Sequence, residues 1–433
     1  MSTKTPIQDS ATERRALSAR LLGREERELL TDRAFLLLLI GRFLAIMGSV
    51  VAPVALAFGF LQDLSGTPTQ LSVVMAAQTI PLVALILVGG VLADRLARNR
   101  VIVVGLVLSA LAFGSIGVMM IDARGPWWTL AIAALLSGIG IAVMNPALAA
   151  IVPELVRKEQ LHAANGLVGI VRNSARILGL LGAGISISIV GGGVTLLFCS
   201  AASAIAAVLF VCVRLRYSVP RDNDSSFLSD LRDGWGAFTR QKWLWIVVVQ
   251  SSLHFAVHGA ALSVIGPALA LSDLGGAATW SMLLAFEAAG TLVGAVLAMR
   301  WRPRRTIFSG VVAIALTMPT PFLLLGVGAP LWMIMAAIFL TGVGMSLLAV
   351  LWSVTVQSLV SPTTLSRVSS YDSLGSMLMS PLGLMLAGPA VALVGAKHAM
   401  LGCGLLLVVI TTISLVSRDV RTVTPDRTPP EPV

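Results

Sequence analysis

Ionisable side chains inside long apolar stretches are the residues of this sequence that could do chemistry. Glu287 stands about eight residues into the apolar stretch 279–299, or ~12 Å along a helix that rises about 1.5 Å per residue. This depth is near the middle of a hydrocarbon layer ~30 Å thick, where an ionised carboxylate costs about 3 kcal/mol. Glu287 is therefore a candidate proton carrier or cation-binding group. The alternative is a protonated structural glutamate held by hydrogen bonds.

Two histidines form a second candidate group. His254 and His258 are four residues apart in the apolar stretch 243–270, so on a helix they share one face. They could titrate, stack on a ligand or line a cavity without a chemical role, and we favour the last of these. A metal site needs more than two ligands, and the sequence offers no third one, so we predict no metal.

Three arginines also lie within apolar stretches, namely Arg42, Arg172 and Arg176. Arginine stays charged in proteins, so each must pair or reach water. Arg42 is near enough to the end of its stretch to extend toward the membrane surface, whereas Arg176 is deeper and is expected to face a central cavity. A paired structural role and recognition of an anionic or polyphenolic ligand both remain open for these side chains.

Motifs for enzymatic chemistry are absent from the sequence. It contains neither the phosphate-binding pattern Gly-x-x-x-x-Gly-Lys-Ser/Thr nor His-Glu-x-x-His, and it offers no plausible catalytic triad outside the apolar stretches. The cysteines Cys199, Cys212 and Cys403 lie within or at the ends of such stretches, which argues against a disulfide framework or a zinc site. We therefore predict that the protein is not an enzyme and needs no cofactor.

The composition shows what must hold these side chains. Of 433 residues 56% are hydrophobic and only 12% charged, whereas soluble domains carry roughly 25% charged residues. Stretches long enough to cross a bilayer as helices recur along the chain. The sequence predicts an all-α integral membrane protein with twelve transmembrane helices at 34–60, 71–93, 101–121, 127–152, 163–190, 194–213, 243–270, 279–299, 306–327, 331–356, 368–394 and 399–416.

The basic residues predict the orientation of these helices. With the N-terminus inside, 26 of the 31 Lys and Arg residues fall in cytoplasmic segments, two (Arg124 and Lys397) in external connections, and three within the helices. This asymmetry follows the positive-inside rule. We expect a multi-pass protein of the inner membrane with both termini in the cytoplasm. The net charge of +10 is thus a topology signal rather than a sign of nucleic-acid binding.

An internal repeat divides the chain into two similar parts. Three patches recur at offsets of 204 or 205 residues: Gly89–Arg95 as Gly294–Arg300, Ser137–Gly140 as Thr341–Gly344, and Gly179–Gly191 as Gly383–Gly395. We predict two pseudo-symmetric six-helix bundles, 34–213 and 243–417, joined by a cytoplasmic linker 214–242. A cytoplasmic arm 1–33 and a disordered tail 418–433 would flank them. Glycines expected to let the helices pack closely are Gly179, Gly182, Gly184 and Gly383.

A charged loop is predicted between the second and third helices. After Gly90, the carboxylate of Asp94 is followed by Arg95, Arg98 and Arg100. A carboxylate there can cap a neighbouring helix and pair with arginines across the bundle. If such contacts form in only one conformation, the loop acts as a gating latch. The alternative is that the arginines are only membrane anchors.

Gly90–Arg100 resembles the cytoplasmic signature of the major facilitator superfamily, from which Ala97 and Asn99 depart. Within that superfamily the chain is similar to enterobactin-exporter-like and macrolide-efflux-like permeases, on the stretches 41–44, 146–156, 164–166, 175–179 and 367–370. The antiporter motif is partial, because Leu180 stands where proline is usual, and the fourth helix has no arginine. The resemblance therefore implies proton coupling by analogy only.

Together these patterns predict a secondary active transporter that works by alternating access. The resemblance favours proton-linked efflux of a small amphipathic or hydrophobic compound, such as a drug, an antibiotic, a siderophore or a secondary metabolite. The expected partners are the lipid bilayer, the small-molecule substrate and protons, and we expect a monomer. An uptake permease is the nearer alternative, and a non-transporting membrane sensor the more distant one.

Overall fold

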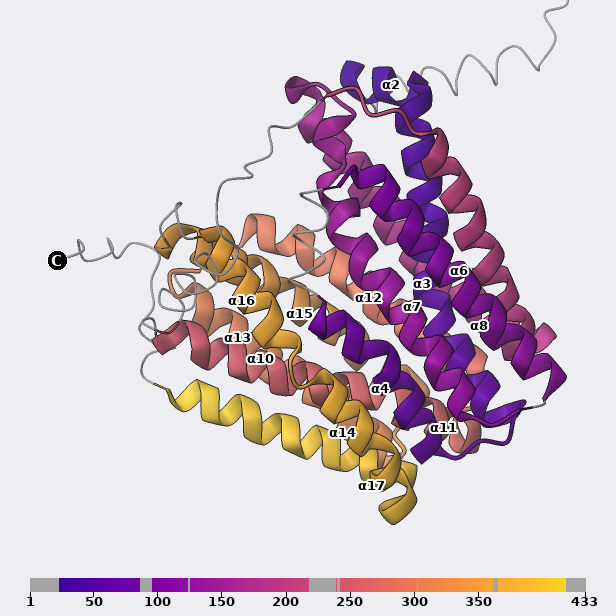
Figure 1. Cartoon of the computed structure of the whole chain (residues 1–433). Coiled ribbons are helices and arrows are strands. Elements are labelled where there is room, and N and C mark those ends of the chain that lie inside the picture. The colour runs from indigo at the N-terminus through magenta and orange to yellow at the C-terminus, as the bar shows by residue number, and fades with distance from the viewer. Residues whose placement is uncertain are drawn as a thin grey trace, which may run out of the picture.

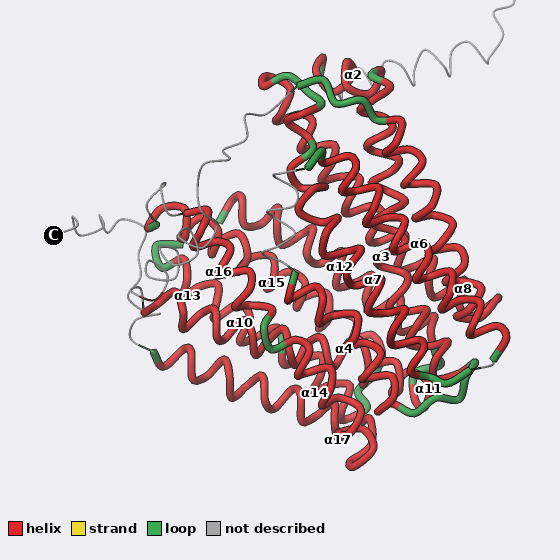
Figure 2. The backbone as a smooth tube through the Cα atoms, viewed as in Figure 1, coloured by secondary structure: helices red, strands yellow, loops and turns green. Residues whose placement is uncertain are grey.

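The computed structural model describes residues 23–85, 96–123, 125–217, 239, 242–301, 303–360 and 365–417. Within these ranges the backbone is helical except for short connections, and it contains no strand (Figure 2). The predicted loop residues Gly90, Asp94 and Arg95 lie outside these ranges, as do Arg124, most of the linker, residues 1–22 of the arm and the tail 418–433.

The helices follow the predicted apolar stretches. A short helix α2 (Arg24–Thr31) precedes α3 (Arg33–Gln62). The remaining elements of the first part are α4 (Pro68–Ala84), α6 (Arg98–Asp122), α7 (Trp128–Ala150), the single turns η1 (Val152–Glu154) and η2 (Lys158–Gln160), and α8 (Leu161–Cys212). Those of the second part are α10 (Lys242–Ala260), the π-helical turn η3 (Ala261–Ile265), α11 (Gly266–Asp273), α12 (Ala277–Arg300), α13 (Thr306–Thr317), α14 (Pro319–Val327), α15 (Leu331–Leu359), α16 (Leu365–Met377) and α17 (Ser380–Val416).

In the described residues nine helical segments are long and apolar enough to cross a membrane. Two of them are interrupted by a glycine with positive φ, Gly191 in α8 (φ 81°) and Gly395 in α17 (φ 80°). Each of these is therefore a pair of helices joined at a residue whose backbone conformation favours glycine. Dividing both raises the number of such segments among the described residues to eleven. The 17-residue α4 lies at the one remaining predicted stretch, 71–93.

The helices form two groups that meet at one end (Figure 1). Helices α3 to α8 pack among themselves, and so do α10 to α17, while α4 contacts α17 and α8 contacts α12 across the boundary. The two groups converge near α11 and diverge toward α2 on one side and α16 on the other. The molecule thus has a closed end, near α11, and an open end.

The apolar packing explains this shape. At the closed end one core joins both groups, with Phe58 and Leu71 from the first and Leu269 and Trp280 from the second. Toward the open end the packing separates, because one core holds only residues of the first group and two smaller cores only residues of the second. Burial of shared apolar surface therefore holds the groups together at the closed end alone.

Two glycines permit the close approach at this end, and they occupy equivalent positions of the repeat. A Cβ at Gly184 of α8 would lie 2.9 Å from the Cα of Ala278 on α12, and one at Gly388 of α17 would lie within 3 Å of Pro68, Thr69 and Ser72 on α4. The amide of Gly388 also donates to the Ser72 hydroxyl at 2.6 Å.

The other glycines that were expected to pack behave differently from one another. Gly383 approaches the backbone of Ala256 closely, whereas Gly179 makes ordinary contacts with Met47 and Val51. A Cβ at Gly182 would meet no atom within 4 Å, so this glycine does not serve a close helix contact in the present arrangement.

Candidate functional site

A central cavity of about 380 Å³ lies between the two groups. Most of its lining is apolar and comes from α3 and α8 on one side and from η3, α11 and α12 on the other. Two side chains of opposite charge stand in this lining, Arg176 from α8 and Glu287 from α12. An apolar wall with a few polar groups suits an amphipathic small molecule.

Glu287 is the centre of the polar group in this cavity. Its side chain is 2% exposed, and its Oε2 lies 3.6 Å from Nε2 of His258 on α10. Arg176 is near enough to interact with it electrostatically. Burial of a carboxylate is costly without such compensation. Three residues that the sequence singled out, far apart in the chain and drawn from both groups, therefore meet at one place.

His254 lies one turn before His258 but lines a different cavity. This second cavity, of about 320 Å³, is lined by α10, α15, α16 and the C-terminal end of α13, all of the second group. His254 is 3% exposed, and its Nε2 has no hydrogen-bond partner among the described residues. The two histidines therefore have different surroundings, because His254 lines this second cavity whereas His258 contacts Glu287.

Asp372 on α16 also lines this second cavity, and the sequence analysis did not identify it. Its Oδ2 accepts a hydrogen bond from Nε1 of Trp352 at 2.8 Å, and its Oδ1 accepts one from Ser376 at 3.4 Å. The signal that could have found Asp372 is the one that found Glu287, a single carboxylate within an apolar stretch.

Arg42 has a structural partner instead of reaching the membrane surface. It is 9% exposed, and its Nη1 donates to the carbonyl oxygen of Leu148 at 2.6 Å. Leu148 belongs to the last turn of α7, whose carbonyl groups lack partners within the helix and carry a partial negative charge. Arg172, which is exposed, interacts electrostatically with Arg42. The structure therefore places Arg42 outside the central cavity lining.

The described part of the charged loop has a similar role. Nη1 of Arg98 donates to the carbonyl of Ala150 at 2.6 Å, and the same atom lies 3.2 Å from Oε1 of Glu154. Arg100 is exposed. Arg98 and Arg42 thus both bind the C-terminal end of α7. A latch that includes Asp94 and Arg95 stays a prediction, since those residues lie outside the described ranges.

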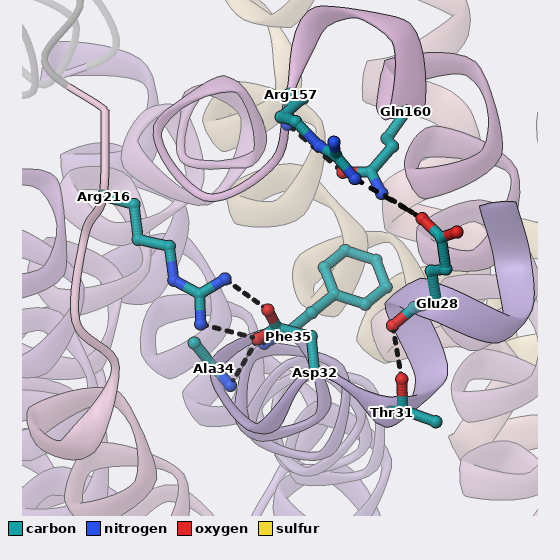
Figure 3. Close-up of polar contacts among 8 residues, drawn as sticks. All are labelled: Glu28, Thr31, Asp32, Ala34, Phe35, Arg157, Gln160 and Arg216. Carbon is teal, nitrogen blue, oxygen red and sulfur yellow. Dashed lines mark hydrogen bonds and ion pairs between the residues drawn. The ribbon is translucent and has the colours of Figure 1, made fainter.

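Further polar contacts at the open end tie α2 to the turn η2 before α8, and the start of α3 to the segment that follows α8 (Figure 3). Asp32 caps α3 by accepting from the amides of Ala34 and Phe35 at 2.8 and 3.2 Å, and it pairs with Arg216. Burial opposes ionisation of Asp32, but these hydrogen bonds and the guanidinium hold its pKa below the usual value. Glu28 lies 3.4 Å from Arg157.

Among the residues that the structure describes, no three His, Cys, Asp or Glu side chains gather to hold a metal ion. The ionisable side chains in the described lining are Arg176 and Glu287 in the central cavity and His254 and Asp372 in the second one.

Comparisons with known proteins agree with this arrangement. The chain is 21% identical over 388 residues to macrolide efflux protein A of Streptococcus pyogenes, covering 88% of this chain and 95% of that protein. It is 25% identical over 389 residues to the multidrug efflux pump Tap of Mycobacterium bovis, covering 86% of this chain and 90% of that pump.

Solved structures show the same fold. The nucleoside transporter NupG matches with a TM-score of 0.70 at 14% identity, over 89% of this chain and 98% of that one. A bacterial homologue of the human lysosomal transporter Spinster, in an inward-facing and unoccupied conformation, matches with a TM-score of 0.67 at 16% identity, over 94% and 100%. The sequence model of the Major Facilitator Superfamily covers residues 38–383. With this coverage and this fold, the chain belongs to the Major Facilitator Superfamily and is a multi-pass membrane transporter.

Proposed function

We propose that the protein is a proton-linked exporter of small amphipathic compounds that works by alternating access between two six-helix domains, 34–213 and 243–417. The observation that carries this proposal is the central cavity, to which both groups of helices contribute and whose lining holds Arg176 and the buried acid Glu287, which is paired with His258. The efflux names of the two relatives support export rather than uptake.

The open end would face the cytoplasm of a cell whose inner membrane holds the protein. Arg157, Lys158 and Arg216 lie at this end of the first group, and Arg304 and Arg305 precede α13 in the second. By the positive-inside rule, this distribution supports cytoplasmic placement of the open end and of both termini. Substrate would then enter the central cavity from the cytoplasm.

Proton coupling would act through charge at Glu287. When the carboxylate is ionised, it attracts Arg176 of the opposite group across the cavity. A proton on Glu287 removes that attraction, so protonation alters the relative free energies of the two arrangements of the groups. His258, which lies 3.6 Å from Glu287, provides a second group that can hold the proton.

Accumulation in cells tests the function and its direction. A strain that lacks the gene and the same strain complemented with it are loaded with a panel of amphipathic antibiotics and siderophores, with and without an uncoupler. We expect several-fold lower accumulation of at least one compound in the complemented strain, and loss of the difference when the uncoupler is added. Higher accumulation would establish uptake instead. Ligand binding by the purified protein without any difference in accumulation would establish a sensor.

A further inference from the structure

The second cavity, within the second group of helices, is lined by one carboxylate, that of Asp372. No lysine or arginine is among the described residues of the lining. The carboxylate is held by Trp352 and Ser376. A carboxylate has about four acceptor positions, so these two hydrogen bonds fix its orientation and leave acceptor capacity for a ligand.

The rest of the lining fits an organic cation with apolar substituents. Phe255 and Trp352 contribute aromatic rings, whose faces attract ammonium groups. Met318 and Met345 contribute flexible, polarisable side chains that adapt to ligands of differing shape. An inorganic cation would be poorly solvated by such a wall, and an anion would be repelled by Asp372.

The buried ring of His254 adds a polar group that points to a ligand. Its Nε2 is buried without a hydrogen-bond partner among the described residues, although buried polar atoms are normally paired. His254 lines this cavity and interacts electrostatically with His258 one turn away. A ligand that brings a polar group to His254 would give this ring nitrogen the partner that it lacks among the described residues.

We propose that this cavity is a subsite for a monovalent organic cation, the protonated amine or quaternary group of an amphipathic substrate, with Asp372 as its counter-ion. This inference rests on the proposed export function in one respect, namely that the cation in the second cavity is the transported compound. The central cavity would receive the apolar body of the substrate or the coupling proton, and the second cavity would select for positive charge.

Binding of two ions of nearly equal shape and opposite charge tests the subsite directly. Full-length protein in lipid nanodiscs is equilibrated with radiolabelled tetraphenylphosphonium or with tetraphenylborate, and empty nanodiscs correct for partition into lipid. We expect the wild-type protein to bind the cation in preference to the anion. Asp372→Asn should weaken binding of the cation about tenfold or more, because a charge-assisted contact is lost, whereas Asp372→Glu should retain the preference.

A matched control separates loss of this counter-ion from loss of any carboxylate. Asp273→Asn, at an exposed carboxylate that pairs with Lys397 and lines neither cavity, should leave tetraphenylphosphonium binding within about twofold of wild type. The proposal is overturned if the wild-type protein shows no preference for the cation, or if Asp372→Asn binds it as wild type does. The binding assay does not involve transport, so a negative result there would not contradict the proposed export function. Likewise, a negative result in the accumulation assay in cells would not contradict the binding of the cation.

Discussion

Replacing Glu287 by glutamine should abolish efflux driven by a pH gradient while leaving substrate binding and membrane insertion intact. Glutamine has nearly the same shape as the protonated acid, so the buried site, 2% exposed in the native protein, keeps its packing. It can neither release a proton nor attract Arg176 with a full charge. The variant should therefore exchange substrate down its own gradient but gain nothing from the proton gradient.

Everted membrane vesicles give the measurement for this variant. The initial rate of uptake of the exported compound is compared with and without an imposed pH gradient, and the gradient should have no effect in Glu287→Gln. Asp273→Asn is the matched control, because Asp273 is an exposed carboxylate that pairs with Lys397 at 2.5 Å. That variant should keep the response within about twofold. A full response in Glu287→Gln would remove this residue from the coupling mechanism.

Placing leucine at Gly388 should prevent the closed end from forming and so stop export. A Cβ at this position already lies 2.3 Å from the carbonyl oxygen of Pro68, and overpacking of this kind typically costs about 1–3 kcal/mol. Because about 1.4 kcal/mol shifts an equilibrium tenfold, the closed arrangement should lose roughly five- to 150-fold in population relative to the alternative.

The same helix offers the control for this substitution. A Cβ at Gly402 of α17 would meet no atom within 4 Å, so Gly402→Leu should preserve export. Retained tetraphenylphosphonium binding and a single peak in size-exclusion chromatography would show that Gly388→Leu is folded. Normal efflux by folded Gly388→Leu would show that α4 and α17 need not approach each other during the cycle.

The sequence predicted the helices well because their physical cause is local. An uninterrupted apolar stretch in a bilayer must satisfy its own backbone hydrogen bonds and therefore forms a helix. The breaks are local too, since Gly191 and Gly395 take a backbone conformation that favours glycine. The family likewise follows from a short motif and is confirmed by the match over residues 38–383.

The pairing of side chains was beyond the sequence because it depends on how helices rotate against one another. Spacing placed His254 and His258 on one face, but only packing decides that His258 meets Glu287 while His254 lines the second cavity. For Arg42 the sequence left open both extension toward the surface and a paired role, but it did not indicate the partner, the carbonyl of Leu148, which lies 106 residues away in the chain. No periodicity in the sequence encodes such contacts.

The most direct test of the account measures distances at both ends of the molecule at once. Spin labels are attached to cysteines introduced at Gln62 and Ser272, exposed positions on α3 and α11 at the closed end, and in a second sample at Lys158 and Arg305 at the open end. Electron–electron double resonance then compares the distances with and without substrate and at neutral and acidic pH. Alternating access predicts that the distance lengthens between the first pair of labels while it shortens between the second. Changes of the same sign at both ends, or no change at either end while the protein transports, would contradict the account.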